Sequence, residues 1–368
     1  MAPDWKASLS VLDRYDTIRS IQAADAIAIE QHAYQSASTL DEYKQICSSA
    51  DRTPATPAVP PPAQQGIRIG PYSDCVPIAD GVTSQVYRCE TTALKVIVHR
   101  AANIAPHNPQ REVQILRRLC PPCVPLLDAF RDDEQRLVLA FPYFPLTLQD
   151  VLSLHDSISP KQRRNIFNDV LRALQSIHSL GIIHRDMKPS AVLLASPNGP
   201  ALLSDFGTAW HPDLSAAHEP PSNKILDIGT GPYRAPEVLF AHRAYGPPVD
   251  MWSLGVMLSE ASRATPPPTP VFESRSVDED GNQLGLILSI FKTLGTPTPQ
   301  TWPEALHFTV SPFELWTVFP QRPWDQILPD VEPTWRDLIA ALIRFDSRRA
   351  TASAALEFPC LAQDKDKD

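Results

Sequence analysis

Nine residues, His184–Val192, constrain this chain more than any other stretch, and they read His-Arg-Asp-Met-Lys-Pro-Ser-Ala-Val. They lie between Ala93-Leu94-Lys95 upstream and Ser204-Asp205-Phe206-Gly207 downstream, and further motifs follow at Ala235-Pro236-Glu237 and Asp250-Met251-Trp252. Each motif is weak when taken alone, but their order along the chain excludes chance similarity. This order therefore fixes the fold class before composition is considered.

Together these motifs resemble the landmarks of eukaryotic protein kinases. The resemblance covers residues 72–361 and implies an α+β class with a two-lobed protein kinase-like fold, in which a small, mostly β lobe precedes a large, mostly α lobe. The apolar spacing agrees, because strands with one helix are expected up to Phe144 and mainly helices after Leu146. We expect the small lobe at 72–141, the hinge at 141–145 and the large lobe at 146–361. The implied reaction transfers the γ-phosphate of ATP to protein serine or threonine, with ATP and Mg²⁺ as cofactors.

Three residues carry the chemistry that this resemblance implies. Asp186 stands at the position that orients the acceptor hydroxyl, and Lys188, two residues later, can neutralise the transferring phosphoryl group. Thr230 aligns with the threonine that braces both of them. The pair Lys188-Pro189 is similar to serine/threonine kinases rather than tyrosine kinases, so a hydroxyl of serine or threonine is the expected acceptor.

One position of the catalytic loop departs from the kinase pattern. The family has a metal-binding asparagine five residues after the aspartate, and this chain has Ala191, which cannot hold a metal ion. Water can replace one amide ligand, so we expect a loss on the order of 10–1000-fold in rate rather than a dead enzyme. Ala191 also supports an alternative, a pseudokinase that acts as a scaffold.

The expected nucleotide site begins with a loop that is short of glycine. Only Gly81 of the three family glycines is present, while Ala79 and Ser84 are small but restrict positive φ. We therefore expect a stiffer loop that still grips phosphate. The residues assigned to the nucleotide are Ile78, Ala79, Asp80, Gly81, Val82, Thr83, Ser84, Gln85, Val86, Ala93, Lys95, Glu112, Phe141, Phe144 and Leu193.

The metal and the activation segment are assigned from the same resemblance. Asp205 is the expected Mg²⁺ ligand, and Phe206 is expected to pack on the helix that carries Glu112. The assigned activation-segment residues are Arg185, Phe206, Gly207, Arg234 and Glu237. The threonine that is usually phosphorylated aligns with Ile225, so Arg185 lacks its usual partner, and Asp227 is the candidate substitute.

Several features are similar to the kinase group that contains the cyclin-dependent kinases. They are Tyr233-Arg234-Ala235-Pro236-Glu237, Leu294-Gly295-Thr296-Pro297 with Thr301-Trp302-Pro303, and Arg349, which is expected to pair with Glu237. In the cyclin-reading helix, however, Asn108 is a good N-cap and Pro109 a good first residue, so this helix should begin only at Pro109. Less surface is then left for a cyclin.

A kinase with these departures resembles the single-subunit kinases that activate cyclin-dependent kinases. The resemblance implies a protein substrate, the activation-segment threonine of a cyclin-dependent kinase, with no cyclin required and a monomeric enzyme. A divergent, cyclin-bound cyclin-dependent kinase is the other alternative.

Outside the kinase region we expect three further segments. Residues 1–52 should form a partly helical extension, since Val11, Tyr15 and Ile18 have helical spacing, and Leu40, Tyr43 and Ile46 repeat it. Residues 53–65 hold five prolines and should be a semi-rigid linker, and 362–368 a charged tail.

The bulk properties limit the partners. A net charge of −9 and a pI near 5.6 argue against nucleic acid or an anionic membrane. No apolar run approaches the roughly 18–20 residues of a membrane helix. Six cysteines without a signal-peptide pattern favour a reducing compartment, so we expect the cytoplasm, the nucleus or both.

Overall fold

The computed structural model describes residues 33, 37, 39–49, 66–81, 83–98, 105–154, 158–264, 268–274, 283–314 and 317–362. The chain divides into two units, Met1–Gln65 and Gly66–Asp368. In the first unit the structure describes helix α4 (Leu40–Ser49), which contains the expected Leu40, Tyr43 and Ile46. Of these, Tyr43 is buried and the other two are partly buried, while Cys47, which the spacing did not include, is also buried. The spacing at Val11–Ile18 and the proline-rich linker lie outside the described residues.

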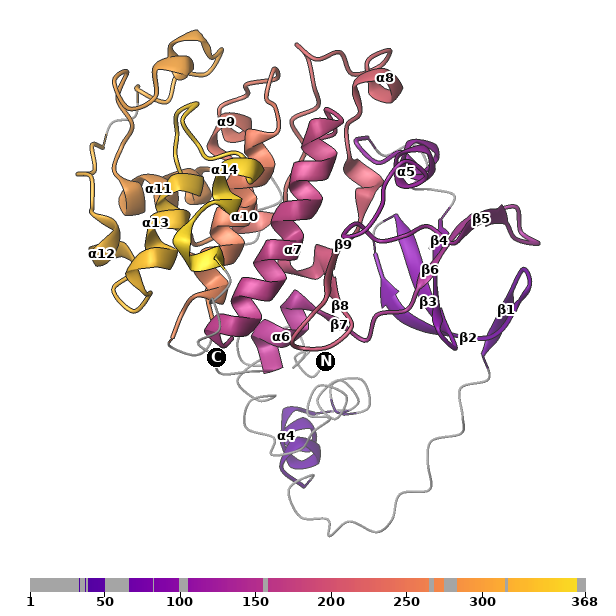
Figure 1. Cartoon of the computed structure of the whole chain (residues 1–368). Helices are drawn as coiled ribbons and strands as arrows, with labels where there is room; N and C mark the ends of the chain where they lie inside the picture. Colours follow the sequence, from indigo (N-terminus) through magenta and orange to yellow (C-terminus); the bar gives the residue numbers. More distant parts are fainter. Residues whose placement is uncertain are drawn as a thin grey trace, which may run out of the picture. The chain divides into compact units, whose positions relative to one another are not determined.

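The small lobe of the second unit is one sheet and one helix (Figure 1). Six strands are antiparallel in the order β1-β2-β3-β4-β6-β5. Their bounds are β1 (Ile67–Ile69), β2 (Tyr72–Asp80), β3 (Ser84–Cys89), β4 (Thr92–Ile97), β5 (Asp128–Arg131) and β6 (Leu137–Pro142), and the helix is α5 (Pro109–Leu116). These elements form the β-rich lobe that the sequence predicts.

One face of this sheet builds a small core of its own. Leu94 and Val96 alternate with Lys95 on β4, so both apolar side chains enter the core while the lysine points to the other face. Cys75 and Cys89 stand opposite each other on β2 and β3 in the same core, and a disulfide joins them with their Cα atoms 4.6 Å apart. This core holds β2 and β3 together on both sides of the expected nucleotide loop.

The sheet of the small lobe includes a short strand that precedes residue 72. Strand β1 pairs with β2 through Ile69 and Tyr72. Gly70 makes the connecting turn with φ of +54°, a conformation that suits glycine. A three-residue strand followed by Gly-Pro is a weak periodic signal, so the sequence analysis does not identify β1.

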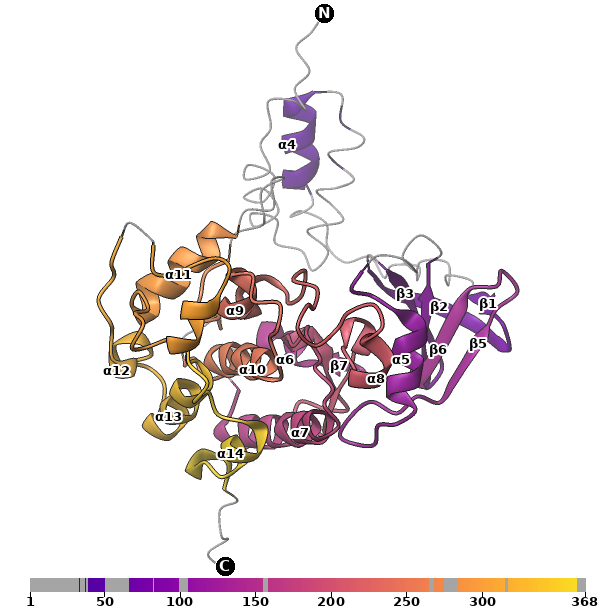
Figure 2. The same ribbon diagram turned by 90° about the horizontal axis from the view of Figure 1, so that it is seen from above.

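The large lobe is mainly helical, and Figure 2 shows it on the side of the second unit opposite the sheet. Its helices are α6 (Leu148–Leu154), α7 (Pro160–Ser179), α8 (Pro212–Ser215), α9 (Pro236–Leu239), α10 (Pro248–Ala261), α11 (Leu284–Leu294), α12 (Trp324–Ile327), α13 (Pro333–Leu342) and α14 (Ala352–Leu356). Short 3₁₀ turns are η3 (Pro189–Ala191), η4 (Phe206–Thr208), η5 (Gly231–Tyr233), η6 (Pro303–His307) and η7 (Pro359–Leu361). A second sheet has the order β7 (Leu146–Thr147), β8 (Val192–Leu194) and β9 (Ala201–Leu203).

Two helices organise this lobe. Helix α7 starts with a capping box, in which Ser159 and Gln162 satisfy each other's backbone N–H groups, and buries an apolar stripe that includes Phe167 and Leu174. Helix α10 is buried along nearly its whole length, so it lies inside the lobe and contacts both α7 and α13. Its buried Asp250 is therefore a structural acid rather than a surface one. Among the described residues, no helix has the length and apolarity needed to cross a bilayer.

Candidate active site

An ion-pair triad joins the two lobes of the second unit. Lys95 Nζ on β4 donates to Glu112 Oε1 on α5 at 2.7 Å and to Asp205 Oδ1 in the large lobe at 3.1 Å. The Lys95–Glu112 pair expected from the sequence is thus present. Gly207 lies beside this pair: a Cβ there would be in ordinary van der Waals contact with Glu112 Oε2 at 3.4 Å and with Lys95 Nζ at 3.5 Å.

Electrostatics keep Lys95 and Asp205 of this triad charged. Burial by itself would lower the pKa of the Lys95 ammonium, but the charges of Glu112 and Asp205 outweigh it and raise this pKa. The same ammonium holds the pKa of the Asp205 carboxyl well below its usual range. At neutral pH the structure therefore presents a lysine cation beside an ionised aspartate.

A second cluster forms around Asp186. Lys188 Nζ donates to Asp186 Oδ2 at 2.6 Å, and Thr230 Oγ1 donates to Asp186 Oδ1 at 2.6 Å. Lys188 Nζ also lies 3.4 Å from Thr230 Oγ1. The three residues that the sequence assigns to catalysis are thus brought together although residues 188 and 230 are far apart along the chain. A carboxylate with both oxygens held in this way is oriented before a substrate arrives.

The backbone of the catalytic loop is fixed from the core. Asp250 accepts the N–H groups of His184 and Arg185 at 2.9 and 2.8 Å. The ring of His184 packs edge-on against Phe206 at 5.0 Å, which agrees with a packing role for this histidine. Arg185 and Asp205 both have positive φ, 73° and 62°, which non-glycine residues adopt only where the surroundings impose it.

The activation segment is tied to the end of the domain. Glu237 accepts a bidentate pair from Arg349, at 2.6 and 3.0 Å, and both side chains are buried. This is the pairing that the sequence predicts. Arg234 donates to the carbonyl of Gly229 at 2.9 Å, which shapes the turn that leads into Thr230.

Asp227 is not the partner of Arg185, contrary to the expectation. Asp227 is 83 % exposed and lies 3.5 Å from Arg234 instead. The guanidinium of Arg185 pairs with Glu219, a buried glutamate that the sequence analysis missed. No short motif marks Glu219. In the sequence it is simply an acidic residue upstream of Ile225, and the fold of the segment determines which acid is buried.

The expected nucleotide loop is a tight turn between β2 and β3. Gly81 N–H donates to Ser84 O at 2.9 Å, and Asp80 pairs with Gln85 in the strand register. Ile78 and Ala79 lie on β2, Val86 on β3 and Thr83 in the turn, where its carbonyl accepts from Val98. Val82 lies outside the described residues.

The other assigned nucleotide residues come from three strands and the hinge. Ala93 on β4 pairs with Phe141 on β6, Phe144 follows in the connection to β7, and Leu193 lies on β8. All four are partly buried, so the strand register gathers apolar surface near the triad.

The residues present fit one divalent cation. The Asp205 side chain is 41 % exposed and ionised, which suits Mg²⁺ because this ion commonly takes one or two carboxylates plus phosphate and water. Ala191 offers a buried methyl group at the place where the family has a second ligand. Its backbone is also committed, since its carbonyl accepts from Ser204 N and Oγ, both at 2.9 Å.

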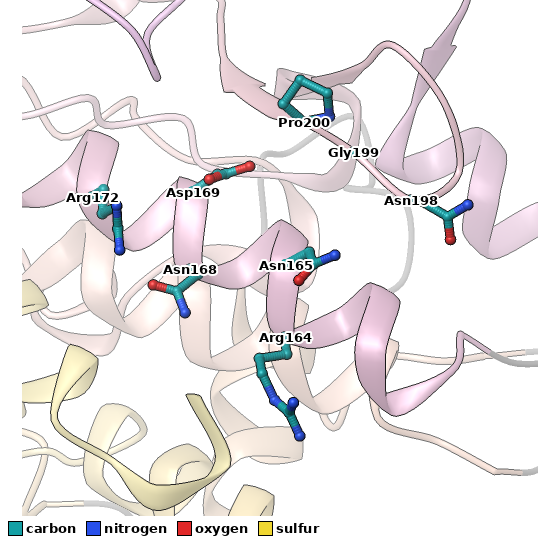
Figure 3. A pocket seen from close by; sticks show the side chains of 8 residues that line it. All are labelled: Arg164, Asn165, Asn168, Asp169, Arg172, Asn198, Gly199 and Pro200. Carbon is teal, nitrogen blue, oxygen red and sulfur yellow. The ribbon is translucent and has the colours of Figure 1, made fainter. Parts of the chain in front are cut away.

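A separate hollow of about 360 Å³ lies between α7 and the β8–β9 turn (Figure 3). Its lining is polar, and none of the assigned site residues belongs to it. Asp169 lines it but is used structurally, because its Oδ2 accepts the N–H of Ala201 at 3.0 Å. The hollow is lined by Arg164, Asn165, Asn168, Asp169, Arg172, Asn198, Gly199 and Pro200.

Comparison with known proteins gives a consistent result. A protein kinase domain model matches residues 72–361. The serine/threonine-protein kinase csk1 of Schizosaccharomyces pombe is 33 % identical over 303 residues, covering 77 % of this chain and 92 % of that protein. The serine/threonine-protein kinase CAK1 of Saccharomyces cerevisiae is 31 % identical over 279 residues, covering 63 % and 76 %.

Two further proteins are also similar to this chain. The cell division control protein 2 homolog 2 of Trypanosoma brucei brucei is 32 % identical over 302 residues, covering 78 % of this chain and 81 % of that protein. Among solved structures, a chain of the yeast RNA Pol II CTD kinase CTDK-1 complex aligns with a TM-score of 0.64 at 23 % identity, covering 77 % and 91 %. The last similarity supports the fold alone.

Proposed function

Because the chain belongs to the protein kinase family and is a protein serine/threonine kinase, we propose that its substrate is the activation-segment threonine of a cyclin-dependent kinase. The observation that carries this proposal is that one chain contains both assembled clusters, Lys95–Glu112–Asp205 and Asp186–Lys188–Thr230, without a cyclin-reading helix of family length. We propose that it acts as a monomer, without a cyclin, in the cytoplasm or the nucleus.

The short helix supports independence from cyclin. Helix α5 begins at Pro109, and the Asn108 side chain accepts from Arg111 N–H, which confirms the predicted cap. The backbone N–H of Asn108 also donates to Gly207 O at 3.1 Å, so the start of the helix is tied to the metal-binding segment. Internal contacts thus hold Glu112 within reach of Lys95, the task that a cyclin performs in the two-subunit kinases that the sequence resembles.

The reaction follows from the two clusters. When bound, ATP with Mg²⁺ supplies the phosphoryl group and much of the charge that neutralises it. Lys95, oriented by Glu112, would hold the nucleotide phosphates, and Asp205 would hold the cation. Asp186 orients the acceptor hydroxyl and accepts its proton, while Lys188 neutralises charge on the transferring group and Thr230 keeps both side chains aligned.

Ala191 favours the second candidate, a scaffold that lacks transfer activity. One experiment separates the two: radiolabelled phosphate transfer from the purified full-length chain to a panel of catalytically inactive cyclin-dependent kinases. Label on the activation-segment threonine, absent when that threonine is changed to valine, is the expected result. Added cyclin should leave the rate of the enzyme unchanged.

The matched control is Asp186→Asn, which keeps the shape but removes the proton acceptor. We expect transfer to fall by about 10³-fold or more while nucleotide binding persists. If no protein of the panel is labelled in ample Mg²⁺ or Mn²⁺, the proposed substrate is wrong. If Asp186→Asn is as active as the wild type, the role assigned to Asp186 is wrong.

A further inference from the structure

We propose that Glu219 is a built-in positioning residue that keeps the activation segment in its working arrangement without phosphorylation. In protein kinases generally, such segments are ordered when an added phosphate pairs with arginines. In this chain a carboxylate already occupies the equivalent of that phosphate. The inference rests on kinase activity itself and not on the substrate proposed above.

Three elements far apart in sequence meet at this carboxylate. Arg185 from the catalytic loop pairs through Nη1 with Glu219 Oε1, and Arg111 from α5 has its Nη1 3.7 Å from Glu219 Oε2. Ile225 N–H donates to Glu219 Oε1 at 2.9 Å, which folds the segment back on itself. Tyr245 closes the arrangement, since its hydroxyl donates to Ile225 O at 2.6 Å and accepts from Arg185 at 3.2 Å.

The site has more donors than one carboxylate can satisfy. Arg111 Nε and Arg185 Nη2 are buried and have no hydrogen-bond partner among the residues that the structure describes. A phosphate group has three terminal oxygens, and a carboxylate has two. The two arginines therefore form a pocket suited to a larger anion, and Glu219 fills it from within the chain.

The charge of Glu219 is essential to this pocket. The Arg185 and Glu219 side chains are 0 % and 3 % exposed, so water cannot replace the carboxylate. Burial lowers the pKa of Arg111 to about 10, and the positive charge of Arg185 is the next cause of this shift. Without the anion the two arginines would repel across the junction of the lobes.

The position of this pocket links it to catalysis. Arg185 immediately precedes Asp186, and Arg111 immediately precedes Glu112. A shift of either arginine would therefore move the residue that orients the acceptor or the residue that orients Lys95. Glu219 acts through these neighbours and does not touch the reacting atoms.

The test uses the full-length chain and a generic serine/threonine substrate such as casein. Wild-type protein treated with phosphatase, with its unphosphorylated state verified by intact mass, should keep its activity. Glu219→Gln should lower kcat/KM by about 10–100-fold, mainly through kcat, with nucleotide binding retained. Asp227→Asn changes an exposed acid of the same segment that pairs with neither Arg111 nor Arg185, and it should match the wild type.

A rescue experiment distinguishes a positioning role of the Glu219 carboxylate from a role in packing alone. In Glu219→Ala, sulfate should restore part of the lost activity relative to chloride at equal ionic strength, and it should leave the wild type unchanged. Loss of wild-type activity after phosphatase treatment would overturn the proposal, as would a folded Glu219→Gln with wild-type kcat/KM or a folded Glu219→Ala that sulfate does not rescue. If neither Glu219 variant folds, the activity of the phosphatase-treated wild type is the measurement that tests the proposal.

Discussion

At the scale of a single residue, Ala191 stands where the family has a metal-binding asparagine, so this site lacks one protein ligand for the metal. It is 1 % exposed, and its carbonyl holds Ser204, the residue directly before Asp205. Its backbone therefore helps to place the one carboxylate that fits a cation, although its side chain contributes no ligand. Among the described residues, no group of three or more His, Cys, Asp or Glu side chains could hold a metal by itself. Nucleotide phosphates and water must complete the coordination.

Restoring the amide should change the metal requirement. We expect Ala191→Asn to lower the Mg²⁺ concentration for half-maximal activity by about tenfold, because one protein ligand replaces a water. Initial rates across a Mg²⁺ titration at fixed nucleotide measure this. Ser190→Asn, at the exposed neighbouring position, is the matched control and should behave as the wild type. An unchanged titration for Ala191→Asn would mean that another group already completes the site.

At the scale of elements, helix α10 supports the catalytic loop through one buried acid. Asp250 accepts from His184 N–H, Arg185 N–H and His178 Nε2 at 2.8–2.9 Å. Burial alone would raise the pKa of Asp250, but the hydrogen bonds from His178 and the backbone outweigh it and hold this pKa below its ordinary value of 3.8. The helix thus contributes a carboxylate that is ionised in the folded state.

Asp250→Asn should destabilise the protein in a pH-dependent way. An amide cannot accept both backbone N–H groups, so we expect a loss of about 2–4 kcal/mol in the free energy of unfolding at pH 7. Since the folded-state pKa is depressed, the stabilisation is fully present above the ordinary pKa of 3.8 and is lost only as pH falls below 3.8 through the lower folded-state pKa. Urea unfolding of both proteins between pH 7 and pH 3 measures the difference. A gap that widened toward acid pH would contradict this account.

The same elements show which features of the fold and the site can be predicted from the sequence and which cannot. The strand around Lys95, the helix start at Pro109 and the Arg349–Glu237 pair follow from local periodicity, capping chemistry and motif order, and the structure has each of them. The Glu219–Arg185 pair and the Cys75–Cys89 bond depend on how distant segments meet in space. The local sequence pattern does not encode contacts between distant segments, so these two features could be identified only in the structure.

At the scale of the whole molecule, the unit Gly66–Asp368 contains both residue clusters that we assign to the kinase reaction. Both hydrophobic cores consist of residues from Ile69 onward. Among the described residues, every contact that builds the two catalytic clusters also lies in this unit. The first unit is therefore not needed to assemble the active site.

Deleting residues 1–65 should accordingly leave kcat/KM within about twofold of the full chain, because the two hydrophobic cores of the second unit lose no side chain. Kinase assays on a generic substrate, with thermal unfolding in parallel, measure this. A truncated protein that folds but loses activity would show that the first unit contributes directly to catalysis.

The buried pairing of Arg349 with Glu237 has a genetic consequence. Every residue that we assign to catalysis, to the nucleotide or to the metal lies before position 231, yet the activation segment is held in place by Arg349, 112 residues after Glu237. A stop codon or frameshift shortly before codon 349 would spare all the catalytic side chains and still produce a null allele. Truncations that remove Arg349 should therefore abolish activity as completely as mutations of the active site.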